Sequence, residues 1–420
     1  MRARTIVLTS LLVATAACTG RGDVREHGEP PEASSLEDVL VLGKQDGTVI
    51  VGSSSGSVLS SGEGQVAAPD GSRLYATTRR DGSTTLETRD SASGDVLSTT
   101  RLRGHLDVRA ASLSGRAVAL MRPLPVGVDP SYALPRTHTR IVIADPTGGA
   151  ATRRYELRGN FEPEAFSVDD TRLFLIQYLP AEAPHEYRVT FLRLLNGRVD
   201  PVFGRFKSPP ERMPGIRLAQ VFDPTSEQLF TLYTNRAAEH FHDGWADASY
   251  GDREVSFVHV LNLQKGWAYC AGLPRSLWGQ PAKAQAMAPS PDGRFLYIVD
   301  SMRGLIAEMD TRSMEIVRSE RIGLGSLDHG RTSARISADG NTLYVGVGGS
   351  AVSRIDIDTL QLLGRWPLPG DVIGLGMSDD GARLYAALGD GVAILDTGTG
   401  EALTTLSFGG VESILHVATP

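Results

Sequence analysis

The side chains of this 420-residue chain that are best suited to chemistry gather in one segment, residues 235–254. It contains His240, His242 and Asp243, followed by Asp247. Imidazole and carboxylate groups bind divalent metals, so His240, His242 and Asp243 are candidate metal ligands. Two histidines separated by one residue converge on an ion only on a strand or in a tight turn, and the sequence shows no further ligand. A divalent metal is therefore the only cofactor considered, and no cofactor is predicted outright.

The same segment also suits recognition of a partner. Trp245 and Tyr250 stand among its acids, and exposed aromatic side chains beside charges are typical of contact surfaces. In the alternative interpretation both rings pack against the fold and the charged groups face water. The residues of this predicted recognition loop are His240, His242, Asp243, Trp245, Asp247 and Tyr250.

No established catalytic motif is present elsewhere. The sequence lacks G-x-S-x-G, H-E-x-x-H, a C-x-x-C pair and a phosphate-binding glycine loop. His416 could face a central channel together with Gln220 or Arg335, but polar residues line such channels without catalysis. No catalytic residue is predicted, and a binding protein is favoured over an enzyme.

A repeated Asp-Gly phrase predicts the elements that must position these residues. An Asp-Gly turn between two short apolar runs, recurring at blade-sized intervals, is typical of a β-propeller. A second Asp, followed three residues later by Ser, Thr or Gly, ends the third strand of the clear units and should cap a tight hairpin. These acids are therefore predicted to be structural. The phrase occurs at residues 67–75, 290–297, 337–344 and 378–385, and the capping acids are Asp90, Asp145, Asp310, Asp356 and Asp396.

The last third of the chain resembles the YVTN-type β-propeller repeat of bacterial exported proteins, which is similar to WD40 repeats. The resemblance rests on Ser290-Pro291-Asp292-Gly293, on Leu343-Tyr344-Val345 and on Leu395-Asp396-Thr397-Gly398-Thr399-Gly400. It covers residues 284–323, 331–370 and 371–410. The resemblance implies an all-β propeller of four-stranded antiparallel blades and an exported protein, and it implies no particular reaction.

Counting the repeats predicts eight blades, with seven as the alternative. Weaker copies begin at Ala111, Phe166 and Phe222, which makes seven complete units from Gln65 onward. Residues 38–60 match strands two to four of a further unit, and residues 413–417 match its missing first strand. The ends of the chain should therefore complete one blade together, which closes the ring and removes exposed sheet edges.

Three insertions interrupt the repeat between the second and third strands of consecutive units. They are residues 121–139, 180–186 and 235–254. Their common position predicts that they project from one face and lie beside one another, where loops commonly carry function.

The N-terminal residues predict export. Arg2 and Arg4 precede a short apolar run, and Ala16-Ala17-Cys18 follow, as in a secretory signal peptide. The segment resembles a bacterial lipobox, in which Cys18 is lipidated, although Thr15 departs from the usual Leu or Val. The predicted organisation is a signal peptide at 1–17, a flexible tether at 18–37 and a propeller at 38–419. The expected location is the outer face of the cytoplasmic membrane, with a secreted soluble protein as the alternative.

Composition narrows the range of partners. Removing residues 1–17 takes away two arginines and no acid, which changes the formal net charge from −7 to −9. A mildly acidic protein is not expected to bind nucleic acid. If Cys18 is lipidated, Cys270 is left alone, as a small buried side chain on a strand. The protein is expected to be a monomer.

Two functional classes follow. The favoured one is a lipid-anchored binding or scaffold module whose insertions contact an envelope protein, a peptide or a glycan. The alternative is a propeller enzyme, such as a lactonase-like hydrolase that uses a metal at the channel mouth.

Overall fold

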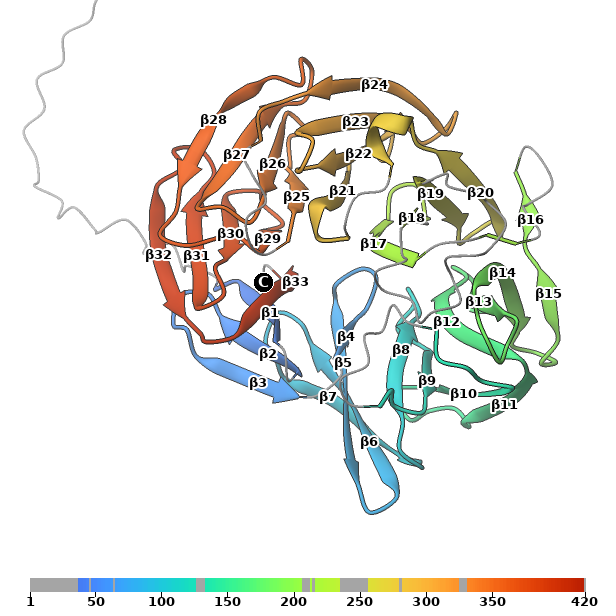
Figure 1. The fold of residues 1–420 in the computed structure, drawn as a ribbon. Coiled ribbons are helices and arrows are strands. Elements are labelled where there is room, and N and C mark those ends of the chain that lie inside the picture. The colour runs from blue at the N-terminus through green and yellow to red at the C-terminus, as the bar shows by residue number, and fades with distance from the viewer. Residues whose placement is uncertain are drawn as a thin grey trace, which may run out of the picture. The chain divides into compact units, whose positions relative to one another are not determined.

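The computed structural model describes residues 37–44, 47–62, 65–125, 133–205, 212–213, 216–234, 256–278, 282–324 and 331–418. Residues from Glu37 onward form one compact unit. It is an all-β ring of eight blades, which confirms the predicted fold class and the count of eight (Figure 1). No helix in the described ranges is long and apolar enough to cross a membrane.

The blades are named A to H in chain order, and each contains a four-stranded antiparallel sheet. Blade A holds β33 (Val411–Ala418), β1 (Val39–Lys44), β2 (Gly47–Gly52) and β3 (Val58–Gly62). Blade B holds β4 (Val66–Ala67), β5 (Arg73–Arg80), β6 (Ser83–Asp90) and β7 (Val96–Arg103). Blade C holds β8 (Asp107–Ala111), β9 (Val118–Met121), β10 (His138–Ala144) and β11 (Arg153–Arg158). Blade D holds β12 (Asn160–Phe166), β13 (Arg172–Leu179), β14 (Glu186–Arg193) and β15 (Val199–Pro201).

Blade E holds β17 (Ile216–Asp223), β18 (Gln228–Thr234), β19 (Ser256–Asn262) and β20 (Trp267–Gly272), with β16 (Phe203–Gly204) added in parallel to β20. Blade F holds β21 (Gln285–Pro289), β22 (Phe295–Asp300), β23 (Leu305–Asp310) and β24 (Glu315–Arg321). Blade G holds β25 (Ser333–Ile336), β26 (Thr342–Gly346), β27 (Ala351–Asp356) and β28 (Leu362–Pro367). Blade H holds β29 (Gly374–Met377), β30 (Arg383–Ala387), β31 (Gly391–Asp396) and β32 (Ala402–Ser407). The 3₁₀ turns η2 (Arg275–Leu277) and η3 (Ala282–Ala284) precede blade F.

The hydrophobic core lies between neighbouring blades. The two middle strands of a blade are buried on both faces, so they consist of continuous apolar runs such as residues 296–299. The outermost strands alternate or are exposed, as β24 is. Between blades E and F, for example, Phe230 and Val258 pack in one cluster with Leu296 and Ile298. Complete burial of each such side chain contributes about 1.5–3 kcal/mol.

The Asp-Gly phrase forms the turn between the first and second strands, as predicted. In blade F, Asp292 Oδ1 accepts hydrogen bonds from Ser290 Oγ at 2.6 Å and from the Arg294 amide at 3.0 Å. Ser290 Oγ in turn accepts the Phe295 amide at 2.9 Å, and Gly293 adopts a left-handed φ of 66°. These donors hold the pKa of Asp292 below its usual value, the Ser290 hydroxyl most strongly.

The predicted capping acids are also confirmed. Asp396 accepts the Thr399 amide and Asp310 accepts the Arg312 and Ser313 amides. Asp90, Asp145 and Asp356 make the same kind of contact in their blades. Both sets of acids are therefore committed to turns on one side of the ring, which we call the turn face.

The ends of the described unit share blade A, as predicted. Strand β33 is the innermost strand and pairs antiparallel with β1, with Val41 opposite His416. Figure 1 shows β33 at the centre of the ring among the other inner strands. Asp38, which precedes β1, is fully buried and joins blade A to blade H. It accepts a hydrogen bond from the Tyr385 hydroxyl and lies 3.2 Å from Arg383 Nε.

The insertions fall where the repeat predicted them. They connect β9 to β10, β13 to β14 and β18 to β19, in consecutive blades C, D and E. In an antiparallel blade these connections lie opposite the turn face. We call that side the insertion face.

Candidate functional site

A cluster of charged side chains lies at the insertion-face ends of three inner strands. Arg109 comes from β8, Glu162 and Glu164 come from β12, and Arg217 comes from β17. Glu162 and Glu164 are two residues apart, and a β-bulge between Pro163 and Ala165 interrupts the regular pairing of β12 with β13 at Glu164. Pro163, which lies between the two acids, is buried. The apolar residues of β12 on either side of the acids are buried too. The two acids are the least buried residues of this strand.

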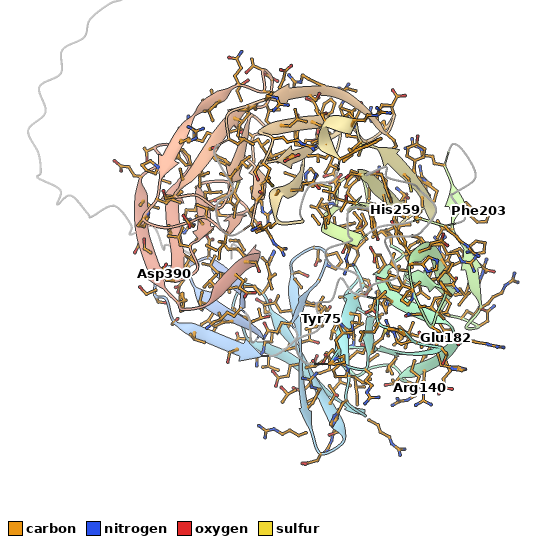
Figure 2. All side chains as sticks on the ribbon, in the orientation of Figure 1. Tyr75, Arg140, Glu182, Phe203, His259 and Asp390 are labelled. Atoms are coloured by element: carbon orange, nitrogen blue, oxygen red, sulfur yellow. The ribbon has the colours of Figure 1, made fainter. Side chains whose placement is uncertain are left out.

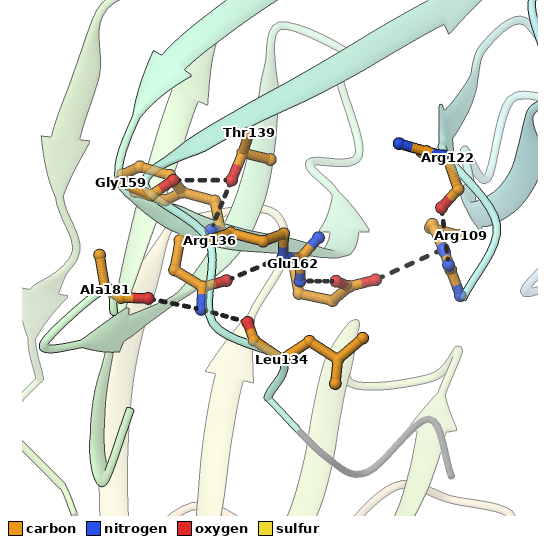
Figure 3. A network of polar contacts seen from close by, with 10 residues as sticks. Arg109, Arg122, Leu134, Arg136, Thr139, Gly159, Glu162 and Ala181 are labelled. Atoms are coloured by element: carbon orange, nitrogen blue, oxygen red, sulfur yellow. Dashed lines mark hydrogen bonds and ion pairs between the residues drawn. The ribbon is translucent and has the colours of Figure 1, made fainter. Parts of the chain in front are cut away.

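Glu162 is held by two arginines (Figure 3). Its Oε2 lies 2.7 Å from Arg136 Nη2, and its Oε1 lies 3.5 Å from Arg109 Nε. The three side chains are only 15–23% exposed, so water screens these ion pairs less than surface pairs. Arg109 also donates to the carbonyl of Arg122 at 3.2 Å, which ties the network to the start of the first insertion.

Asn160 joins the first two insertions beneath this network. The side chain is fully buried, and Nδ2 donates to the carbonyls of Leu134 at 2.7 Å and Ala181 at 3.3 Å. Its Oδ1 accepts a hydrogen bond from Arg136 Nε at 3.1 Å. The Arg136 amide also donates to the Ala181 carbonyl at 2.9 Å. The described parts of these two insertions therefore lie side by side, as their positions in the repeat predicted.

Glu164 forms the second half of the cluster. Its side chain is 4% exposed, and Oε2 lies 3.5 Å from Arg217 Nη1. Oε1 accepts a hydrogen bond from Gln220, which also donates to Thr231 at 3.1 Å. Burial raises the pKa of Glu164, while the Arg217 guanidinium and the Gln220 amide oppose that rise. Glu164 is thus a carboxyl group that can hold a proton more readily than an exposed glutamate.

Tyrosines line the space around these charges. Tyr178, at the end of β13, experiences the charges of Arg217, Glu162 and Glu164, and burial raises its pKa to about 12. Tyr187 and Tyr233 stack with ring centroids 4.6 Å apart, and Tyr233 stacks on Phe257 at 5.5 Å. An aromatic layer from blades D and E therefore supports the charged cluster.

His259 lies next to that layer but is not equipped for proton transfer at neutral pH. Its ring centroid is 6.4 Å from that of Tyr233, and the residue is 4% exposed (Figure 2). Burial lowers the pKa of His259 to about 4, so the imidazole is neutral at physiological pH.

The arrangement can bind polar groups of both signs. Arg109, Arg136 and Arg217 present planar forks of N–H donors that suit carboxylates and carbonyls. Glu162 and Glu164 accept hydrogen bonds from amides, hydroxyls or ammonium groups. Within the described ranges there is no group of three or more His, Cys, Asp or Glu side chains that could hold a metal ion.

The recognition loop predicted from the sequence lies outside the described residues. This applies to His240, His242, Asp243, Trp245, Asp247 and Tyr250, and also to Cys18. The ends of the segment that carries the loop are described: β18 ends at Thr234 and β19 begins at Ser256, beside Tyr233 and Phe257. The loop therefore starts and finishes at the aromatic layer of the charged cluster.

Three residues were proposed to line the channel: His416, Gln220 and Arg335. Only His416 and Arg335 are close enough to interact. Gln220 binds Glu164, whereas His416 lies against Gly71 and within electrostatic range of Arg335. Burial lowers the pKa of His416, and the nearby acids Asp379 and Asp70 oppose that effect.

The charged cluster was not predicted from the sequence. Its residues come from three different repeats, in blades C, D and E, and each blade supplies only one or two of them. They therefore share no sequence motif. A signal was nevertheless present. The inner strands are mostly small or apolar, and Glu162, Glu164 and Arg217 depart from that composition.

Comparisons with known proteins identify the fold. No family model matches the chain, and no curated protein matches it. Among solved structures, dihydro-heme d1 dehydrogenase NirN in complex with DHE superposes with a TM-score of 0.55 at 17% identity, over 93% of this chain and 76% of that chain. Apo AztD from Citrobacter koseri superposes with a TM-score of 0.51 at 10% identity, over 91% of this chain and 97% of that chain. At these identities the likeness extends to the β-propeller fold alone.

Proposed function

We propose that this protein is a lipid-anchored, extracytoplasmic binding module that contacts an envelope protein, a peptide or a glycan through the insertion face of blades C to E. One observation carries the proposal. The charged cluster around Glu162 and Glu164 lies where all three insertions begin, and two of those insertions are fastened to it by Asn160.

The chemistry of the site supports recognition of a polar partner. Arginine is enriched where proteins contact one another, and Arg109, Arg136 and Arg217 are partly exposed here, whereas Tyr187 and Tyr233 are buried and support the cluster from within. Arg109 and Arg136 are already paired with Glu162, so their orientation is fixed before a partner arrives. Such preorganisation reduces the entropy lost on binding.

The location and lineage of the protein belong to the same proposal. Arg2, Arg4 and the run ending at Cys18 support export and lipidation, and the repeat phrases support descent from YVTN-type propellers. The tether would let the ring reach partners near the membrane surface.

The proposal is tested by recovering partners from solubilised envelopes of the native host with the full-length lipidated protein. Two variants are compared with the wild type: deletion of residues 235–254, and Arg109→Gln. Arg140→Gln is the matched control, because Arg140 is 82% exposed on β10 and lies at the outer part of the ring (Figure 2). We expect both site variants to lose the same partner and the control to retain it. Identical partner sets in all four proteins would refute the binding site.

The anchor is tested separately. Cys18→Ala should move the protein from the membrane fraction to the soluble fraction and abolish incorporation of labelled palmitate. If the variant stays in the membrane fraction and still incorporates label, Cys18 is not the anchor.

A lactonase-like hydrolase is the second candidate function, and Glu164 is the residue that favours it. A buried carboxyl group with a raised pKa next to an arginine can serve as a general acid or base. The test is a panel of lactones assayed with the wild type and Glu164→Gln. Metal content is measured in parallel for the wild type and for alanine at His240, His242 and Asp243. Turnover that Glu164→Gln abolishes would favour the enzyme, and bound metal lost in the triple variant would make it metal-dependent.

A further inference from the structure

A cavity of about 210 Å³ lies on the turn face, between blades E and F and away from the charged cluster. It is built from the turns β17–β18, β19–β20 and β23–β24 and from the residue after β16. For comparison, an engineered cavity of about 150 Å³ holds a benzene molecule, so this one accepts a ring-sized ligand. The lining residues used below are Arg205, Glu227, Gln228, Lys265, Trp267 and Arg312.

The lining carries an excess of positive charge. Arg205, Lys265 and Arg312 face one acid, Glu227. Within the described part of the chain, neither Lys265 nor Arg312 forms an ion pair with a carboxylate. Because the lining holds three cationic side chains and one acidic side chain, its net positive charge favours an anionic ligand.

Gln228 provides an independent indication of a ligand. It is 7% exposed, it lines the cavity, and its Oε1 forms no hydrogen bond with any described residue. A buried amide oxygen without a partner costs free energy, so such groups are normally satisfied. A ligand in the cavity that donates a hydrogen bond would satisfy it, since Gln228 is one of the lining residues.

The walls of the cavity are held in place by the fold. The guanidinium of Arg205 lies over the Trp267 ring at 4.7 Å, and β16 fixes this part of the chain against β20. Phe203, at the start of β16, is at the outer part of the ring (Figure 2). The Lys265 amide donates to Asn262 Oδ1 at 2.7 Å, which sets the turn that carries the lysine side chain. The cations are thus presented by ordered turns.

We propose that this cavity binds a small hydroxylated carboxylate of the sugar-acid class. The carboxylate would lie between Lys265 and Arg312, and hydroxyl groups would donate to Gln228 and Glu227. A simple anion would leave those two acceptors without partners, and a neutral sugar would leave the cations unpaired. The inference does not depend on the proposed function, because the cavity and the charged cluster are on opposite faces.

The test is titration of the full-length protein with D-glucuronate, followed by isothermal calorimetry or saturation-transfer NMR. D-Glucose serves as the neutral counterpart, inorganic phosphate as the simple anion, and alanine as the zwitterion. The variants are Arg312→Gln and Gln228→Leu. Arg116→Gln is the control, because Arg116 is an exposed arginine in a turn of the same face, between β8 and β9 of blade C.

We expect D-glucuronate to bind the wild type and the control equally, and Arg312→Gln to weaken binding at least tenfold. Gln228→Leu should weaken binding of D-glucuronate while leaving any weak phosphate binding unchanged, which separates hydroxyl recognition from charge. Thermal unfolding of each variant shows whether the ring is intact. Absence of D-glucuronate binding to the wild type would overturn the proposal. Equal binding of glucose, phosphate or alanine, or an unchanged affinity in Arg312→Gln, would also overturn it.

Discussion

Glu164 shows how one buried side chain can link protonation to stability. Burial raises its pKa above the usual 4.5, so the folded protein binds this proton more tightly than the unfolded chain does. The resulting stabilisation is complete below the unfolded pKa and is lost as the pH rises through the folded pKa. Arg217 and Gln220 limit this loss without removing it.

We predict that Glu164→Gln will flatten part of the pH profile of stability. As the pH rises from below 4.5, the usual pKa of glutamate, through the raised pKa of Glu164, the wild type should lose stability relative to the variant, because glutamine cannot ionise. Each tenfold difference in proton affinity corresponds to about 1.4 kcal/mol. The measurement is urea unfolding at several pH values, with the exposed Glu156→Gln as control. A constant difference between wild type and Glu164→Gln across this range would contradict the prediction.

The residues of the charged cluster illustrate what the sequence could not predict. Asp292 and Asp396 could be assigned to turns because each sits in a repeated local pattern with a known backbone role. Arg136 and Glu162 are 26 positions apart, and their contact depends on how an insertion of blade C reaches blade D. No local pattern records such a contact between blades. The chemistry-bearing histidines that did attract attention, His240 and His242, lie outside the described residues.

At the scale of elements, blade A, which the two ends of the described unit share, is the feature that the repeats predicted best. Residues 38–60 were assigned as strands two to four and residues 413–417 as the missing first strand, and β1, β2, β3 and β33 confirm this assignment. The prediction succeeded because strand periodicity and turn residues are local properties. Blade A is also joined to blade H by polar contacts that the repeats did not predict. They connect Asp38 with Tyr385 and Arg383.

We predict that Tyr385→Phe will destabilise the ring by about 1.5–3 kcal/mol, since it removes a hydrogen bond to a buried carboxylate. Tyr75→Phe is the control, because Tyr75 is the equivalent buried tyrosine in blade B and its hydroxyl forms no hydrogen bond with a described residue. Chemical denaturation of both variants measures the difference. Equal losses in the two variants would show that the Asp38 contact contributes nothing.

At the scale of the whole molecule, the repeated turns make stability depend on acid pH. The pKa values of Asp292, Asp339 and Asp380 are lowered, mainly by the hydroxyl of the serine two residues earlier. Asp396 is lowered mainly by the amide of Thr399. Each such group stabilises the fold above its unfolded pKa, and that contribution is lost as the pH falls through the folded pKa.

We therefore predict that the denaturation midpoint will fall steeply as the pH drops below about 4, the range where free aspartate takes up its proton. The first turns of neighbouring blades are in contact, Gly381 with Ala338 and Gly340 with Pro291, so losses in adjacent blades should be coupled. Protonation of Glu164 and Asp300, whose pKa values burial raises, acts in the opposite direction. Urea unfolding at pH values between about 2.5 and 7 measures the effect, and a midpoint that does not change over that range would contradict it.

The shared blade A also governs the order in which the molecule can be assembled. Strand β1 is synthesised before all other described strands, and its partner β33 is synthesised after all of them. Until then the chain can form only an open arc with an unpaired edge, and closing so long a loop is entropically costly. Pairing of β33 with β1 is thus expected to be the last step of folding. Separation of these two strands is expected to be the first step of unfolding. The charged cluster comes from blades C to E, so blade B on one side and blades F to H on the other separate it from blade A, and such opening is expected to leave it largely undisturbed.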